Sequence, residues 1–206
     1  MTIAQNLSRF ASQIVPLTVD QYDTLIRNGV VEERAPIELL DGILVRKDRS
    51  HTGDDPLIIG NDHIFSVEAV RDLNDRLRSY GVHMRSQQPI RIPPQNEPEP
   101  DGSVVVGSLR DYAHRKPEPE SVVIVLEVAD SSLEFDRTTK HAIYATAAIP
   151  QYVIVNLVDR VIEIYADPVA AEARYAASEV KRLGETLTLN LPAGQSLNVA
   201  VNDLLP

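Results

Sequence analysis

Apolar residues recur at helical spacing in two parts of the chain. Thr18 is followed three residues later by Gln21, which is the spacing of a capping box, and the helix they begin should end at Asn28-Gly29. Its apolar face would consist of Leu17, Val19, Tyr22, Leu25 and Ile26. A longer helix is predicted from Asn61 to Gly81, where apolar residues return every three or four positions, at Ile64, Val67, Val70, Leu73 and Leu77.

Short apolar segments predict strands between and after these helices. Asp41-Gly42 favours the positive φ angles of a tight turn and separates two such segments, so a β-hairpin is predicted with Glu38 on its first strand. A proline-rich stretch then brings Asp101 to the start of a strand over residues 103–106. Residues 121–128 form a β-branched apolar run typical of a strand buried on both faces, and Glu127 is its one charged residue.

The second half of the chain continues the alternation of helix and strand. Ser131 or Ser132 can cap a helix that ends at Ile149-Pro150 and carries Asp136, Lys140 and Tyr144 at intervals of four. Residues 152–155 and 161–165 should pair as another hairpin, and short strands are expected around Leu187, Leu189, Leu197 and Val199. The Ala-rich stretch up to Ala177 gives no clear pattern. We predict the α/β (α+β) class, with one domain over residues 17–206 and an N-terminal extension over residues 1–16.

Composition narrows the chemistry that this domain can support. A chain of 206 residues with 43% apolar content can bury one continuous core. Cysteine is absent, so a bound metal must have oxygen or imidazole ligands, which favours magnesium or manganese over structural zinc. Residues 1–16 lack the apolar segment of a signal peptide, and no apolar run is long enough to cross a bilayer. We therefore expect a cytoplasmic protein without a membrane partner.

The charge balance restricts any contact with nucleic acid. A formal net charge of −10 argues against a protein that coats nucleic acid or anionic membranes, because phosphate binding depends on basic groups. Any contact with DNA must therefore be local. The basic concentrations are Arg71, Arg76 and Arg78 in one predicted helix and Arg110, Arg115 and Lys116 in one predicted loop. Such groups are more often solvated faces than binding sites.

Three charged residues suggest a catalytic site. Glu127 lies near the end of a buried apolar strand. A charged carboxylate there lowers the stability of the fold unless a cation or hydrogen bonds compensate its charge. Asp101 opens the preceding strand, so adjacent strands could bring both carboxylates to one edge of the sheet, where a divalent cation would relieve their repulsion. Lys140, on the next helix, could reach back towards that edge. This combination suits metal-assisted phosphodiester hydrolysis.

Each of these residues also has a purely structural interpretation. Asp101 can be a turn residue after Pro100. Glu127 can face solvent at the strand end or pair with a buried arginine. Lys140 can form an ordinary surface pair with Asp136 at i,i+4. In the same structural interpretation, Tyr144 packs the helix that carries Lys140. His63 caps or packs the long helix that begins at Asn61.

Taken together, the segments resemble the Uma family of restriction-endonuclease-like proteins. The resemblance extends from about Leu17 to the C-terminus and is strongest over residues 101–165. It rests on Glu38-Leu39-Leu40-Asp41-Gly42, Pro100-Asp101, the apolar run ending in Glu127-Val128, Asp130 to Arg137, Lys140, Tyr144-Ala145 and Ile149-Pro150-Gln151-Tyr152.

The resemblance implies a PD-(D/E)xK nuclease fold, a restriction-endonuclease-like mixed β-sheet flanked by helices, with extra β-hairpins. It also implies a DNA substrate and a magnesium or manganese ion held by Glu38, Asp101 and Glu127, with Asp101, Glu127 and Lys140 as catalytic residues. The lysine of the parent motif lies two residues after the glutamate, where this chain has Ala129. The Uma pattern places it on the following helix instead, at Lys140.

Two other functions remain open at this stage. A catalytically silent binding or scaffold protein could keep the fold and the acidic pocket, although intact Asp101, Glu127 and Lys140 speak against it. A metal-dependent hydrolase of another phosphoester would need a closed pocket rather than an open groove. A homodimer could build a substrate cleft between two subunits, which one sequence does not establish.

Overall fold

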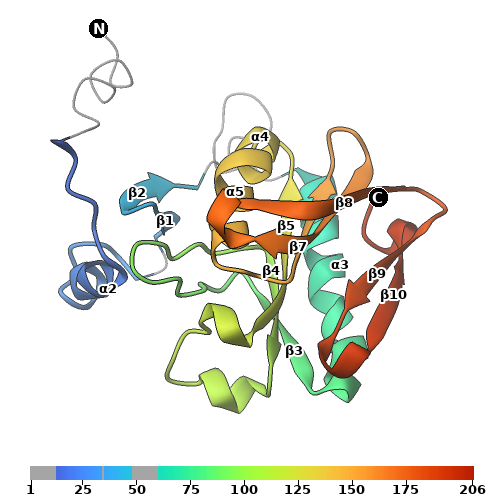
Figure 1. Ribbon diagram of the computed structural model, residues 1–206, viewed down its shortest axis with the longest axis horizontal. Helices are drawn as coiled ribbons and strands as arrows, with labels where there is room; N and C mark the ends of the chain where they lie inside the picture. Colours follow the sequence, from blue (N-terminus) through green and yellow to red (C-terminus); the bar gives the residue numbers. More distant parts are fainter. Residues whose placement is uncertain (1–12, 34, 48–59) are drawn as a thin grey trace, which may run out of the picture.

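A six-stranded mixed sheet forms the centre of the computed structural model, which describes residues 13–33, 35–47 and 60–206 (Figure 1). The strand order is β3-β4-β5-β6-β7-β8, and β5 and β6 are parallel whereas the other neighbours are antiparallel. The strands are β3 (Val82–Ser86), β4 (Gly102–Val106), β5 (Val122–Ala129), β6 (Gln151–Asn156), β7 (Val161–Val169) and β8 (Arg174–Arg182). The predicted mixed sheet is confirmed. Most of the predicted extension over residues 1–16 lies outside the described residues. So does nearly all of the stretch 51–60, whose sequence is typical of a loop.

Both faces of this sheet are covered. Helix α3 (Asn61–Leu77) and the hairpin of β9 (Thr186–Asn190) and β10 (Ser196–Ala200) lie on one face, and α4 (Leu133–Phe135) and α5 (His141–Thr146) lie on the other. Strand β5 contributes to both apolar layers, since Leu126 packs in the cluster with α3 and Val125 in the cluster with α5. Successive side chains of a strand point to opposite faces, which explains why the run over residues 121–128 is apolar throughout.

The N-terminal elements form a small unit beside the sheet (Figure 1). It contains helix α2 (Val19–Arg27) and the hairpin of β1 (Ile37–Leu40) and β2 (Ile43–Arg46). The capping box is present, because the Thr18 side chain accepts from the Gln21 backbone N–H and the Gln21 side chain accepts from that of Thr18. Asp41 and Gly42 have φ angles of 48° and 76°, as expected for the tight turn. A Cβ on Gly42 would lie 2.3 Å from the Cβ of Pro16, so the chain also needs glycine there for close packing.

Three local expectations differ from the structure. The helix after Ser132 is not regular, because a π-helical turn over Asp136–Lys140 joins α4 to α5. The Ser132 hydroxyl donates to Asp136 Oδ2 and makes no capping bond to the backbone. Ile64, assigned to the buried face of α3, is 48% exposed.

Strand β8 is absent from the sequence-based prediction. It is an edge strand whose side chains are mostly exposed, so it lacks the apolar alternation that would identify it. Among the described residues, no helix combines the length and apolarity needed to cross a membrane.

Candidate active site

Two carboxylates meet at one edge of the central sheet. Gly102 in β4 pairs with Leu126 in β5, so Asp101 and Glu127, one residue further on, are neighbours at the ends of adjacent strands. The Val128 backbone N–H donates to Asp101 Oδ2 at 2.9 Å, which fixes the direction of the Asp101 carboxylate. Both residues are buried, with exposed fractions of 9% for Asp101 and 3% for Glu127. Asp101 is thus more than a turn residue, and Glu127 does not face solvent.

The Lys140 ammonium lies among carboxylates and is itself buried. Its Nζ is 2.9 Å from Glu127 Oε1, 3.5 Å from Glu38 Oε1 and 3.7 Å from Asp136 Oδ1. The alternative of an ordinary surface pair with Asp136 is therefore wrong, because both side chains are withdrawn from solvent. The structure brings together all four residues predicted for the site: Glu38, Asp101, Glu127 and Lys140.

Tyr144 has a polar contact that the sequence analysis missed. Its hydroxyl donates to Glu127 Oε1 at 2.8 Å, and the side chain is fully buried. Tyr144 lies four residues after Lys140, so both side chains reach the same carboxylate from consecutive turns. A buried tyrosine usually needs a hydrogen-bond partner, and its i,i+4 spacing from Lys140 was the signal available in the sequence.

Glu38 enters the site from the N-terminal hairpin. The Glu99 backbone N–H donates to Glu38 Oε1 at 2.6 Å, and the Glu97 N–H donates to the Leu39 carbonyl oxygen at 2.7 Å. The segment before Asp101 therefore holds strand β1 through both a side chain and the backbone. The same segment positions Asp101 and Glu38.

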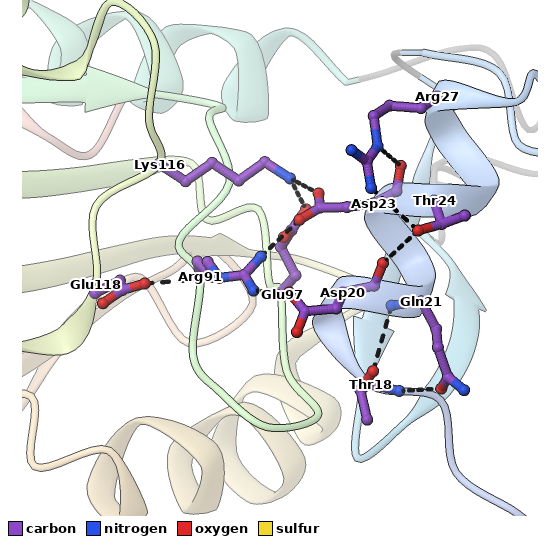
Figure 2. Close-up of polar contacts among 10 residues, drawn as sticks. All are labelled: Thr18, Asp20, Gln21, Asp23, Thr24, Arg27, Arg91, Glu97, Lys116 and Glu118. Carbon is purple, nitrogen blue, oxygen red and sulfur yellow. Dashed lines mark hydrogen bonds and ion pairs between the residues drawn. The ribbon is translucent and has the colours of Figure 1, made fainter.

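A charge cluster holds this proline-rich segment against helix α2 (Figure 2). Arg91 donates to Asp23 at 2.6 Å and to Asp20 at 2.5 Å, while Lys116 donates to Asp23 at 2.7 Å and to Glu97 at 2.6 Å. Glu97 is only 3% exposed, and its Oε2 accepts no hydrogen bond from the described part of the chain. Lys116, which the sequence analysis grouped with solvated basic residues, is here the main compensation for a buried carboxylate.

Replacing Lys116 with methionine should therefore destabilise the protein by about 2 kcal/mol, because Glu97 would lose its cation while remaining buried. The free energy of unfolding in urea measures this change. Arg71→Met is the matched control, since Arg71 pairs with Glu68 on an exposed helix surface, and its loss should cost less than about 0.5 kcal/mol. Equal effects of the two substitutions would contradict the assigned role of Lys116.

A second polar network fixes the π-helical turn that carries Lys140. The Arg137 guanidinium donates from Nη2 to Glu163 Oε1 at 2.6 Å and from Nε to both Glu163 oxygens at 3.1 Å. Glu163 lies on β7 and also accepts from Asn156 and Tyr165. Because Arg137 follows Asp136 directly, this network ties the turn to the sheet.

Burial and charge shift the protonation of the site. Burial raises the pKa of Glu127 to about 8, Lys140 opposes that rise, and Asp136 and Asp101 add to it. Burial also raises the pKa of Asp136, and the positive charge of Lys140 again opposes the rise. For Lys140, burial acts to lower the pKa, but the surrounding carboxylates hold it well above the ordinary value. One ammonium thus shares the site with more negative charge than it can neutralise, which favours binding of a further cation.

The carboxylate oxygens of the site suit a hard cation, such as magnesium, that keeps some of its water ligands. No three histidine or acidic side chains within the described ranges are grouped closely enough to hold a metal ion by themselves. Magnesium usually binds one or two carboxylates and completes its shell with water and substrate phosphate, rather than using an all-protein cage. Asp136 Oδ1 is buried and accepts no hydrogen bond from the described residues, so one further oxygen is available. Binding by Glu38, Asp101 and Glu127 stays a prediction.

The carboxylates and the lysine line a pocket of about 400 Å³. Its wall also contains Arg46, Lys47, His63, Gln87 and Ser131. The Gln87 amide lies 3.5 Å from Asp101 Oδ1. His63, which the sequence analysis left out of the site, is one of the residues that line the pocket. The pocket is large enough for part of a substrate and combines acidic and basic groups.

A mixed sheet with buried carboxylates and a lysine at one edge places this protein in the restriction-endonuclease-like class of nuclease folds. A family model described as "Putative restriction endonuclease" matches residues 19–200. The chain belongs to this family, Uma2.

The fold comparison agrees with the family. The chain is similar to a crystal structure described as "a putative nuclease belonging to DUF820" from Anabaena variabilis ATCC 29413. The TM-score is 0.63 at 14% sequence identity, and the match covers 92% of this chain and 97% of the other. At that identity the likeness shows a shared fold. Comparison with curated proteins gives no match.

Proposed function

We propose that this protein is a magnesium- or manganese-dependent endonuclease that hydrolyses phosphodiester bonds of DNA. The observation that carries the proposal is the buried Lys140 ammonium, 2.9 Å from Glu127 Oε1 in a pocket that also contains Glu38 and Asp101. Membership of the Uma2 family supports the nuclease class. Asp101 and Glu127, with Glu38, would hold the metal through direct or water-mediated bonds.

The residues of the pocket have distinct tasks in this proposal. A bound metal ion would polarise the phosphoryl oxygen and lower the pKa of a water molecule. Lys140 would orient the attacking water or neutralise charge that develops on the phosphoryl group. Tyr144 and the Val128 backbone N–H hold Glu127 and Asp101 in place through hydrogen bonds, so these carboxylates need little rearrangement during the reaction.

Binding of DNA by an acidic protein needs local basic groups. Arg46 and Lys47 lie at the end of the β1–β2 hairpin and line the pocket together with the acidic residues. Lys47 Nζ donates to the Glu99 carbonyl oxygen at 2.5 Å, which holds it at the pocket wall. These side chains could contact a phosphate close to the scissile bond even though the formal net charge of the chain is −10.

The test is cleavage of supercoiled plasmid and of branched DNA with magnesium or manganese. Wild type should cleave, and Asp101→Asn should lose at least a hundredfold in rate, because asparagine can still accept the Val128 N–H bond but carries no charge for the metal. Asp75→Asn on the exposed side of α3 is the matched control and should cleave normally. Absence of cleavage of DNA or RNA by wild type, with metal binding confirmed by calorimetry, would favour a scaffold protein.

A further inference from the structure

Arg85 is a half-buried cation without an acidic partner. It lies on the edge strand β3, with its guanidinium carbon 5.5 Å from the centre of the Tyr112 ring. No carboxylate within the described residues lies within 4.0 Å of it, and its buried Nε makes no hydrogen bond. Burial lowers the pKa of Arg85, and Tyr112 opposes that change.

This isolation is unusual for a half-buried arginine of this protein. The sequence has 30 acidic and 20 basic residues, and Arg91 and Arg137, which are also half-buried, each have carboxylate partners in the structure. A cation–π contact is weak at a partly exposed site and does not replace the hydrogen bonds that a partly buried guanidinium loses. Arg85 is therefore held in place without the anion that would compensate it.

A second guanidinium contacts the same ring. The Arg115 guanidinium carbon lies 4.9 Å from the centre of the Tyr112 ring, and its Nε donates to the backbone oxygen of Asp111 at 3.0 Å. The Asp111 carboxylate accepts from the Ser108 backbone N–H and hydroxyl. Arg85 and Arg115 thus bring two positive charges to one tyrosine, and neither forms an ion pair within the described ranges.

The Arg85–Tyr112–Arg115 cluster lies on the same face of the sheet as the candidate active site. Arg85 pairs with Ser103 in β4, two residues after Asp101, and alternate residues of a strand share a face. Gln87, two residues after Arg85, lines the pocket. Two residues of the chain span at most about 7 Å. A polymeric substrate with its reacting group in the pocket would therefore come within reach of the cluster.

We propose that Arg85 and Arg115, held by Tyr112, bind the phosphate backbone of DNA next to the position at which the pocket acts. This proposal rests on the proposed function, which sets where the scissile bond of the DNA lies. Phosphate oxygens match the planar fork of a guanidinium, and they would supply the anion that Arg85 lacks. Contacts of this kind position the DNA and carry no sequence preference.

The test measures binding of a short fluorescein-labelled DNA duplex by fluorescence anisotropy, in EDTA and again in calcium, at several salt concentrations. Arg85→Met and Arg115→Met should each weaken binding by about tenfold or more. Each should also reduce the slope of log affinity against log salt by about one, which a purely structural role would not change. Arg85→Lys should keep the wild-type slope because the charge remains. Arg71→Met, which removes an exposed and paired arginine, should bind as wild type does.

Folding and association are checked on the same variants. Arg85→Met should melt no lower than wild type, because it removes a partly buried charge that has no partner. Wild-type affinity and salt slope in Arg85→Met would overturn the proposal, and so would failure of wild type to bind the duplex. A change from dimer to monomer in Arg85→Met, measured by light scattering, would also overturn it, since the missing anion would then belong to a second copy.

The two proposals fail in different ways. If DNA binding depends on Arg85 but no divalent metal supports cleavage, the proposed nuclease function is wrong and the phosphate contact is retained. If Arg85→Met binds and cleaves DNA normally, the phosphate contact is wrong and the nuclease function is retained.

Discussion

Replacing Glu127 with glutamine should abolish metal-dependent cleavage while preserving the fold. Glutamine has the same shape, and its amide oxygen can still accept from Tyr144 and Lys140, which contact Glu127 Oε1 at 2.8 Å and 2.9 Å. The negative charge is lost, however, and with it the main attraction for a divalent cation. We expect the cleavage rate to fall by a hundredfold or more and the magnesium-induced rise in melting temperature to shrink.

The same substitution should change how stability depends on pH. In the metal-free folded protein, burial raises the pKa of Glu127 to about 8, whereas an unfolded glutamate releases its proton near 4.5. The folded state therefore binds one more proton between these values. The contribution to stability is fully present below pH 4.5 and is lost as the pH rises through about 8, at no more than about 1.4 kcal/mol per pH unit. Glutamine has no such proton, so this slope should disappear in Glu127→Gln.

Magnesium should reverse the sign of this dependence, because it binds the ionised carboxylate and must displace the proton. The affinity of magnesium for wild type should rise with pH up to about pH 8. The rise should be about tenfold per pH unit, because binding releases one proton. Calorimetric titrations at several pH values measure this, with exposed Glu120→Gln as the control. Equal metal binding by wild type and by the Asp101→Ala, Glu127→Ala double variant would refute both ligands.

Local sequence signals predicted most of the fold. The Thr18–Gln21 capping box, the Asp41-Gly42 turn and the apolar run of β5 each determine structure through neighbouring residues, and each was confirmed. Glu127 was found because a charge in such a run needs a partner. The buried position of Lys140 could not be read from its spacing, since an i,i+4 pair with Asp136 is equally compatible with a helix surface.

Other features depend on contacts between distant segments. Strand β8 pairs along an exposed edge, so its sequence lacks an apolar pattern, and the π-helical turn over Asp136–Lys140 has no local signature. The Glu99 N–H that holds Glu38 is separated from it by 61 positions in the chain. Likewise, Lys116 looked like a member of a solvated basic group until the fold placed Glu97 beside it.

Lys140→Ala should separate the task of the lysine from that of the carboxylates. Removal of the ammonium leaves Glu127, Glu38 and Asp136 without their shared cation, so the metal-free variant should melt at a lower temperature than wild type. Magnesium should then stabilise the variant more than it stabilises wild type, because the ion meets less repulsion and more uncompensated negative charge. Metal affinity should be retained or increased.

Cleavage by Lys140→Ala should nevertheless be slower by about a hundredfold or more, because the group that acts on the attacking water or the phosphoryl charge is missing. Rates are compared at saturating metal and at a temperature well below the melting point of the variant. Lys140→Met, which keeps most of the side-chain volume, distinguishes loss of charge from a cavity, and Lys181→Ala on the exposed strand β8 is the control. If Lys140→Ala cleaves DNA as fast as wild type, the lysine serves only to neutralise buried carboxylates. The catalytic trio of Asp101, Glu127 and Lys140 would then be wrong, even though the three side chains share one pocket.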